Sequence, residues 1–288
     1  MSILLNRDTR VLVQGITGRA GRAQTRWMLD YGTNIVAGVT PGRGGEEVEG
    51  IPVYDTVARA VSERGVEAAV IFVPPPAVKD AALQAIESGV RVIAVVTEHM
   101  PVHDAMLLKA HTVGRKVWLV GPTSPGIITP GQAKIGIMPG NVFTPGRIGV
   151  ISRSGTLSYE ISVNLTAAGL GQSTVVGIGG DPVVFTGMVE LLELFSNDPD
   201  TDAVVVVGEV GGVQEEQAAG FIAQRMTKPV VAYIAGQNAP QGKRMGHAGA
   251  IVRGDAGSAE SKMTALREAG AEIARYPLEV VSLVTKHL

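Results

Sequence analysis

The chain has 288 residues, which at about 150 residues per domain predicts two domains. Its 25 lysines and arginines are nearly balanced by 27 aspartates and glutamates, which argues against a nucleic-acid-binding protein that uses a broad basic face. Apolar residues make up 45% of the chain and cysteine is absent, so a buried core is expected, whereas disulfides, cysteine-ligated metals and a thiol nucleophile are excluded.

The first part of the chain alternates short apolar runs with amphipathic stretches. The predicted strands are Arg10–Gln14, Asn34–Val39, Ala68–Val73, Arg91–Val96 and Val117–Val120. The predicted helices between them are Arg19–Tyr31, Thr56–Glu63, Val78–Ser88 and Val102–Val113. This alternation implies a parallel sheet with helices on both faces, so we expect a Rossmann-like domain at residues 1–121.

A segment rich in glycine and proline at residues 122–146 lacks helical periodicity and predicts an ordered connector. Alternation then resumes. The predicted strands are Ile148–Ser152, Ser173–Ile178, Ala203–Val207, Val230–Ile234 and Glu272–Ala274. The predicted helices are Leu157–Ala168, Gly187–Phe195, Val213–Arg225, Ser258–Ala269 and Leu278–Lys286. The expected fold class is therefore α/β with two tandem domains, the second being a flavodoxin-like, doubly wound parallel sheet at residues 147–288.

Membrane and metal sites are not expected. Every apolar run is shorter than the roughly 18 residues that span a bilayer, and the N-terminal MSILLNRDTR lacks the features of a secretory signal. We therefore expect a soluble, cytoplasmic protein. His99, His103 and His111 include one i, i+4 pair, but no carboxylate-rich cluster accompanies them, so we predict no metal site on this chain.

Ligands of open parallel sheets bind at the carboxyl ends of the strands, so the loops that follow the strands are the informative ones. After the first strand comes GITGRAG (Gly15–Gly21), whose glycines either receive a phosphate at a helix N-terminus or only pack helix against strand. Arg43 follows the second strand, where a carboxylate would be typical of an NAD site. It is either an ordinary loop charge or the partner of an extra ribose phosphate, as in NADP or coenzyme A.

Three loops of the second domain carry polar groups at the equivalent edge. Ser152–Thr156 opens a helix and is either a simple N-cap by Ser154 or an oxyanion or phosphate site. Glu209 follows a strand among glycines and is either an exposed loop residue or a functional carboxylate. His247 lies among very small residues, in a mobile surface loop or as a catalytic nucleophile. The stretch Gly236–Arg244 approaches a Walker A motif but has one residue too many between its glycines and lacks the Ser or Thr, so we predict no nucleoside triphosphate site there.

Four motifs, in order along the chain, together resemble the alpha subunit of the succinyl-CoA synthetase (succinate–CoA ligase) family. They are VTPGRGG (Val39–Gly45), SRSGTLSYE (Ser152–Glu160), GIGGDP (Gly177–Pro182) and GKRMGHAGAI (Gly242–Ile251). The resemblance implies an acid–thiol ligase of the citric acid cycle that works in three reversible steps: phosphate converts succinyl-CoA to succinyl phosphate and CoA, a histidine takes the phosphoryl group, and a nucleoside diphosphate receives it. It also implies an ATP-grasp beta subunit, in an αβ or α2β2 assembly, that holds Mg²⁺ and ATP or GTP.

The resemblance also implies roles for individual residues. His247 matches the phosphorylated histidine and Glu209 the carboxylate that orients it. The expected CoA-binding residues are Thr17, Gly18, Arg19, Ala20, Arg43, Val96, Thr97 and Glu98. The expected phosphate-binding residues are Ser154, Gly155 and Thr156, and Tyr159 matches a succinate-side position.

One loop departs from the pattern of the family. Many relatives read GPNCPG where this chain has Thr123 and Ser124 in place of Asn and Cys, so a role for a cysteine there is void and the acid specificity is less certain. Malate–CoA ligase and ADP-forming acetyl-CoA synthetase therefore remain alternatives. An NADP-linked oxidoreductase or nucleotide-sensing protein is a further alternative from another class.

Overall fold

The computed structural model describes residues 2–239, 244–252 and 257–288. The chain divides into two compact units. The N-terminal unit comprises Leu4–Met138 and Val183–Phe185, and the C-terminal unit comprises Pro139–Pro182 and Thr186–Leu288 with the first residues of the chain. The segment predicted as a connector is thus divided between the two units.

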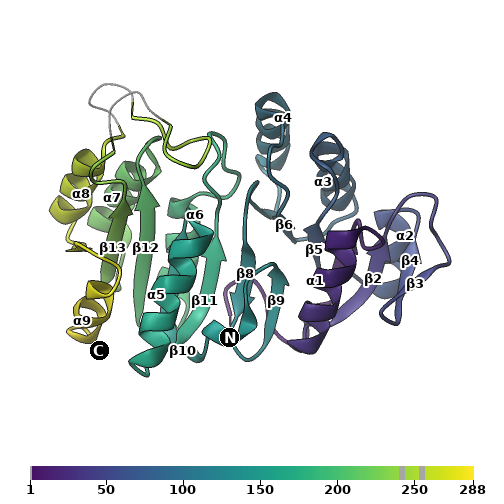
Figure 1. Ribbon diagram of the computed structural model, residues 1–288, viewed down its shortest axis with the longest axis horizontal. Helices are drawn as coiled ribbons and strands as arrows, with labels where there is room; N and C mark the ends of the chain where they lie inside the picture. Colours follow the sequence, from purple (N-terminus) through teal and green to yellow (C-terminus); the bar gives the residue numbers. More distant parts are fainter. Residues whose placement is uncertain (1, 240–243, 253–256) are drawn as a thin grey trace. The chain divides into compact units, whose positions relative to one another are not determined.

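The N-terminal unit is built on a sheet with the strand order β3-β4-β2-β1-β5-β6-β7 (Figure 1). Its strands are β1 (Val11–Gln14), β2 (Ile35–Val39), β3 (Glu47–Val48), β4 (Ile51–Tyr54), β5 (Ala68–Ile71), β6 (Val92–Val95) and β7 (Trp118–Val120). Its helices are α1 (Arg19–Asp30), α2 (Val57–Arg64), α3 (Val78–Glu87) and α4 (Val102–Thr112), with a 3₁₀ turn η1 (Pro75–Ala77). All neighbouring strands except β3 and β4 pair in parallel, and from β4 inward the order is that of the Rossmann fold, as predicted.

Two strands of this sheet, β3 and β4, were not expected. The run Ile51–Tyr54 is short and contains Pro52, which cannot donate a main-chain hydrogen bond and is therefore confined to the margins of sheets. Pro52 lies opposite Glu47 of the two-residue strand β3, and only Val53 and Tyr54 pair with β2. Proline thus masked a real strand next to the edge of the sheet.

The predicted connector contains a hairpin. Strands β8 (Gly126–Thr129) and β9 (Ala133–Gly136) are antiparallel, and a 3₁₀ turn η2 (Gly140–Val142) follows. A Cβ atom on Gly126, where φ is +106°, would stand 2.8 Å from the Cα of Gly136. The glycines that made this segment look irregular are required because the two backbones approach so closely.

The C-terminal unit contains a parallel sheet with the order β14-β13-β12-β10-β11. Its strands are β10 (Pro145–Ser152), β11 (Gln172–Gly177), β12 (Ala203–Glu209), β13 (Val230–Ala235) and β14 (Glu272–Ala274). Its helices are α5 (Gly155–Ala167), α6 (Met188–Asn197), α7 (Gln214–Arg225), α8 (Ala259–Glu268) and α9 (Glu279–Thr285). Helix α5 contacts α9, and α7 contacts both α6 and α8, so helices cover both faces (Figure 1). The order is that of flavodoxin-like sheets, which confirms the predicted fold class.

The register of this sheet gathers the loops that follow its strands. Ser152, the last residue of β10, pairs with Gly177 at the end of β11 and with Val207 in β12. Glu209, at the end of β12, pairs with Ala235 at the end of β13. The carboxyl ends of four strands therefore meet at one edge, where their loops can build a common site.

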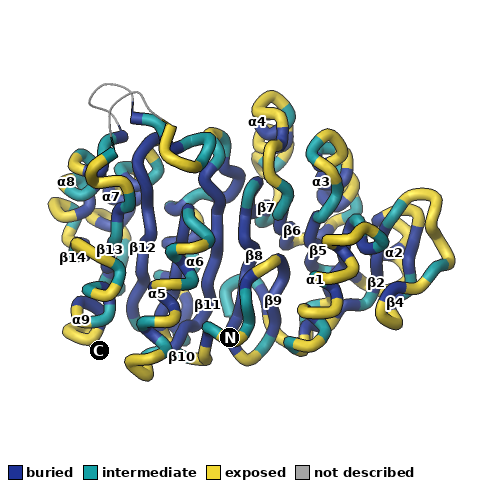
Figure 2. Tube along the Cα trace, viewed as in Figure 1, coloured by how far each residue is buried: buried dark blue, intermediate teal, exposed yellow. Residues whose placement is uncertain are grey.

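The strands form the core of each unit, while the outer faces of the helices are exposed (Figure 2). Ala203, Val204, Val205, Val206 and Val207 of β12 are all 0% exposed. On a neighbouring strand, a Cβ on Gly149 would stand 2.6 Å from the ring of the fully buried Phe195. No helix within the described ranges combines the length and the apolar character needed to cross a membrane.

Gly220, inside α7, is expected to be a site where alanine stabilises the fold. It is exposed, and a Cβ atom there would meet nothing within 4 Å. Alanine also restricts the unfolded chain more than glycine does, so Gly220→Ala should raise the free energy of unfolding by about 0.5–1 kcal/mol. Urea unfolding at constant m-value checks this, and a lower midpoint would contradict it.

Candidate active site

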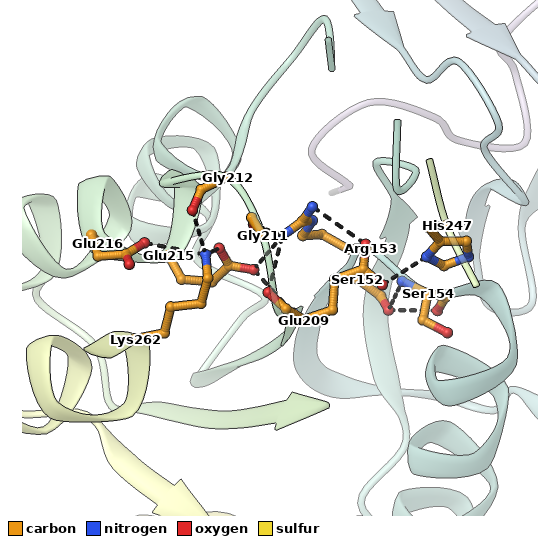
Figure 3. Close-up of polar contacts among 10 residues, drawn as sticks. All are labelled: Ser152, Arg153, Ser154, Glu209, Gly211, Gly212, Glu215, Glu216, His247 and Lys262. Atoms are coloured by element: carbon orange, nitrogen blue, oxygen red, sulfur yellow. Dashed lines mark hydrogen bonds and ion pairs between the residues drawn. The ribbon is translucent and has the colours of Figure 1, made fainter. Parts of the chain in front are cut away.

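His247 lies in a loop after β13 that is closed by a bridge between Arg244 and Ile251. Its Nδ1 atom is 2.7 Å from Oε2 of Glu209, the last residue of β12 (Figure 3). The histidine side chain is 33% exposed and the glutamate side chain 9%. Glu209 is therefore not an exposed loop residue, and its contact favours the catalytic interpretation of His247 over a surface loop. Among the described residues, none is a hydrogen-bond partner of Nε2, which leaves that nitrogen available for reaction.

Three glycines make room for this contact. A Cβ on Gly180 would stand 2.7 Å from Cβ of His247 and would overlap the imidazole ring itself. Gly249 donates its main-chain N–H to the carbonyl of Gly180 at 2.9 Å. A Cβ on Gly211, where φ is +86°, would overlap the carbonyl oxygen of Gly249. The GIGGDP motif is thus needed at least in part because the imidazole lies directly against its backbone.

Glu209 is held from behind by Arg153, a residue that the sequence analysis did not single out. Arg153 follows β10 and is 3% exposed. Its Nη2 lies 3.3 Å from Oε1 of Glu209, and its Nη1 donates to the carbonyl oxygens of Glu209 at 3.1 Å and Gly211 at 2.8 Å. The signal that could have found it is a charged residue directly after a buried strand, at the same sheet edge as Glu209.

The surroundings of His247 shift its pKa upward. The hydrogen bond to Glu209 is the largest cause; burial opposes it, the negative charges of Glu209 and Asp181 add to it, and the positive charge of Arg153 opposes it. A raised pKa means that the imidazole stays protonated to a higher pH than an ordinary histidine. Because only the neutral ring is a nucleophile, the chemistry of this site should fade as the pH falls through that raised pKa.

The start of α5 comes directly after Arg153 in the sequence. Ser154 is the N-cap residue: its hydroxyl accepts the N–H of Leu157 at 3.3 Å, so the capping interpretation is confirmed. Ser152 Oγ donates to the Ser154 carbonyl and accepts its N–H, which fixes the turn (Figure 3). Capping leaves the N–H groups of Gly155 and Thr156 in the first helical turn, where anions bind.

Tyr159, one turn further along α5, is partly buried, and burial raises its pKa. Its ring meets the ring of Phe143 edge to face, with centroids 6.2 Å apart. The tyrosine side chain is therefore uncharged, and its packing against Phe143 sets its orientation.

The predicted CoA-binding loop of the N-terminal unit joins β1 to α1. Gly15 has φ +78°, and a Cβ on Gly21 would stand 2.9 Å from Cα of Ile16, so both glycines are needed for the tight turn. Thr17 Oγ1 donates to Thr40 Oγ1 at 3.1 Å, which ties this loop to the one after β2. The remaining residues of the motif, Gly18, Arg19 and Ala20, are exposed at the start of α1.

Arg43 lies in the loop after β2, where its main-chain N–H donates to the Thr40 carbonyl at 3.0 Å. Its guanidinium forms an ion pair with Glu46, with Nη2 donating to Oε2 at 2.6 Å. The hydrogen bond from Arg43 lowers the pKa of Glu46, and the charge of Arg22 on α1 contributes to that shift. The guanidinium group that was expected to bind a phosphate is thus paired with a carboxylate.

The third predicted CoA segment follows β6. Thr97 Oγ1 donates to the Val73 carbonyl at 2.7 Å, Val96 is partly buried and Glu98 is exposed. The departure from the family pattern lies next to it, because the Thr123 N–H donates to the Thr97 carbonyl at 3.2 Å. Ser124, where many relatives carry cysteine, is 2% exposed and accepts the Gly126 N–H, so it holds the loop.

In the part of the chain that the structure describes, no group of three or more His, Asp or Glu side chains could hold a metal ion. The segment that resembles a Walker A loop includes residues 240–243, which lie outside the described residues, as does the start of the GKRMGHAGAI motif.

Comparison with known proteins tests the resemblance. Residues 6–99 match the model of the CoA binding domain family, and residues 151–272 match that of the CoA-ligase family. The succinate–CoA ligase [ADP-forming] subunit alpha 2 of Archaeoglobus fulgidus is 54% identical over 100% of both chains. The corresponding subunit alpha of Aquifex aeolicus is 51% identical over 100% of this chain and 95% of its own. The chain belongs to the succinate–CoA ligase alpha-subunit family. The resemblance given by the four motifs is thereby confirmed.

Solved structures agree on the fold. The ATP citrate lyase of Methanothrix soehngenii, in complex with citrate and coenzyme A, aligns with a TM-score of 0.88 at 24% identity over 98% of this chain and 51% of that chain. The dinucleotide-forming acetyl-coenzyme A synthetase 1 of Ca. Korarchaeum cryptofilum, in complex with phosphate and ADP, aligns with a TM-score of 0.74 at 22% identity over 93% of this chain and 58% of its own. This chain thus spans little more than half of these longer chains, with which it shares the architecture.

Proposed function

We propose that this chain is the alpha subunit of an ADP-forming succinate–CoA ligase, in which His247 carries the phosphoryl group between succinyl phosphate and the nucleotide. The observation that carries the proposal is the contact of Nδ1 with the buried Glu209 carboxylate. That contact makes Nδ1 the protonated nitrogen and leaves the lone pair on Nε2, which is partly exposed with its ring.

The reaction follows from these groups. Phosphate attacks the thioester carbonyl of succinyl-CoA, the C–S bond breaks, and CoA leaves with a proton, giving succinyl phosphate. Nε2 of neutral His247 then attacks phosphorus, the bond to the acyl oxygen breaks, and succinate leaves as a carboxylate. Glu209 faces the resulting positive ring through Nδ1–H. Finally the terminal oxygen of ADP attacks phosphorus, the P–N bond breaks, and ATP forms as the lone pair returns to Nε2.

The start of α5 supplies the phosphate site in this proposal. The N–H groups of Gly155 and Thr156 and the helix dipole favour the anion, with Ser154 as the cap that shapes the turn. Tyr159 bounds the succinate side. The groups at the start of α5 stabilise charge on phosphoryl oxygens, while the imidazole of His247 forms the covalent bond to phosphorus.

The N-terminal unit binds CoA in this proposal, through Thr17–Ala20, Arg43 and Val96–Glu98. The matched CoA binding domain family supports this assignment. Arg43 would receive the 3′-phosphate, and because Glu46 already holds the guanidinium, the phosphate must replace a carboxylate there. A bidentate arginine suits this exchange, since phosphate and carboxylate present similar oxygen geometry.

Arg43→Gln is expected to weaken CoA binding about tenfold and to leave dephospho-CoA binding unchanged, because only CoA carries the 3′-phosphate. Titration calorimetry with both ligands measures the difference. Arg59→Gln is the matched control, since Arg59 is also an exposed arginine of this unit that pairs with a nearby glutamate, Glu63. Equal losses for CoA and dephospho-CoA would remove the proposed role of Arg43.

A beta subunit completes the enzyme in this proposal, as the naming of the curated relatives as alpha subunits supports. We propose an ATP-grasp partner that holds Mg²⁺ and the nucleotide, in an αβ or α2β2 assembly. Co-expression with that partner, followed by light scattering of the purified complex, distinguishes the two assemblies. We further place the enzyme in the cytoplasm and in the citric acid cycle, which cell fractionation and growth on succinate-yielding substrates test.

The assay that tests the function uses the complete complex with succinyl-CoA, phosphate and ADP. ATP and free CoA should appear in equal amounts, and in the reverse direction succinate should release phosphate from ATP in a CoA-dependent manner. Malate and acetate in place of succinate separate the two alternative CoA ligases. Preference for either acid over succinate would overturn the succinate assignment.

A further inference from the structure

Behind the histidine pair lies a buried array of charges that the proposed reaction does not use directly. Arg153, Glu215 and Lys262 are 3%, 0% and 0% exposed. Glu215 Oε1 accepts from Arg153 Nη1 at 3.0 Å and from the Glu209 N–H at 3.1 Å, and Oε2 accepts from Lys262. Figure 3 shows this chain of contacts leading from Lys262 to His247.

Two helices anchor the far end of the array. Lys262 of α8 also donates to the Gly212 carbonyl at 3.1 Å and to Glu216 Oε2 at 3.2 Å. Burial acts to raise the pKa of Glu215, but the charges of Arg153 and Lys262 outweigh it and the pKa is lowered. Glu215 therefore stays ionised and holds Arg153 at a fixed position.

Stability alone is a weak reason for such an array. Removing several ionised groups from water is costly, and well-packed apolar residues often stabilise a core as well or better. What the array does achieve is geometric. Arg153 forms an ion pair with Oε1 of Glu209 and donates to the main-chain carbonyls of Glu209 and Gly211, which restrains the carboxylate while Oε2 faces His247.

We propose that Arg153, held by Glu215 and Lys262, is a positioning residue for the phosphoryl transfer: it locks the Glu209 carboxylate so that Nδ1 of His247 keeps the proton and Nε2 attacks. This inference rests on the proposed function. An orienting carboxylate fixes the tautomer and the direction of a catalytic histidine only if the carboxylate is itself held. Arg153 supplies that restraint without touching the reacting atoms.

Arg153 also affects the protonation of the His247 imidazole. The charged groups that face His247 are Glu209 at the end of β12, Asp181 after β11 and Arg153 after β10, and Arg153 alone among them favours the neutral ring. Removing its charge should raise the pKa of His247 further, so that more of the histidine is protonated near neutral pH. Charge and geometry can therefore be separated by two substitutions.

The experiment measures the rate of His247 phosphorylation by labelled ATP in the complete complex across a pH series. Arg153→Gln should lower the plateau rate at least tenfold and move the acid limb to higher pH. Arg153→Lys keeps the charge but cannot reach all the acceptors of a guanidinium, so its plateau should fall while its acid limb stays at the wild-type position. Arg147→Gln, which removes an exposed arginine of the same strand paired with Asp202, is the control and should change neither.

Each result decides the inference. Thermal unfolding identifies variants that do not fold. If Arg153→Gln does not fold, the nitrogen-15 resonances of His247 in Arg153→Lys still report the tautomer. A wild-type plateau in either folded variant, or an unchanged Nδ1–H tautomer together with unchanged rates in Arg153→Lys, would overturn the positioning role. If the wild-type complex takes up no label on His247, the proposed function itself fails, which is a separate outcome.

Discussion

His247→Asn is expected to abolish phosphoryl uptake and to slow the complete reaction by about 10⁴-fold or more, the scale seen when a catalytic nucleophile is removed. The asparagine amide can still donate to Glu209, so the loop should keep its structure, but no nucleophilic nitrogen remains where Nε2 stood. Formation of succinyl phosphate precedes the histidine step. Release of CoA from succinyl-CoA and phosphate should therefore persist.

The measurement is label from ATP retained on the chain, assigned by mass spectrometry and by its stability in base and lability in acid. His103→Asn, at an exposed histidine of the other unit, is the matched control and should label like the wild type. Undiminished label in His247→Asn, or label mapped to another residue of the active wild type, would disprove the assignment of the nucleophile.

Gly180→Ala is expected to lower phosphorylation of His247 about a hundredfold or more while leaving the fold intact. The new Cβ would occupy the space of the imidazole, at 2.7 Å from the histidine Cβ and closer still to the ring. Because φ at Gly180 lies outside the left-handed region, the backbone accepts alanine, and the strain falls on the ring. Moving the imidazole by about 1 Å relative to Glu209 is enough to lower the rate by two orders of magnitude.

The companion measurement is the free energy of unfolding, which should fall by no more than about 1–2 kcal/mol, since the partly exposed loop of His247 can shift. Gly220→Ala is the matched control, because the same substitution there meets open space. A Gly180→Ala enzyme with wild-type phosphorylation would show that the imidazole does not work in the position seen here.

Most of the fold could be predicted because short apolar runs alternate along the chain with longer stretches that can form helices. Continuous apolar runs such as Ala203–Val207 are typical of strands buried on both faces, and the structure places this run in the centre of a parallel sheet. Besides the two-residue strand β3, strands β4, β8 and β9 were missed, the last three for a physical reason. Their prolines and glycines are tolerated only because of where the chain lies in the sheet, and that position is not written in local sequence.

The residues of the candidate site were likewise predicted only in part. His247 and Glu209, 38 positions apart, could be named because each stands in an unusual local setting, a histidine among very small residues and a carboxylate among glycines at the end of a strand. Arg153 could not be assigned a partner, because its contacts reach 56, 58 and 62 positions along the chain. A charged side chain after a strand is common, and only burial makes it informative.

The amino-acid sequence alone determined the alternation of strands and helices, the two α/β halves and the family, and it predicted His247 as the nucleophile, since all of these depend on short-range patterns. Tertiary structure alone decided that Glu209 is buried, that Arg43 is already paired with Glu46, and that Arg153 holds the carboxylate behind the histidine. The physical reason is that exposure and ion pairing are properties of groups brought together by packing. A residue type fixes its charge and its hydrogen-bonding capacity, whereas the fold decides which partner uses them.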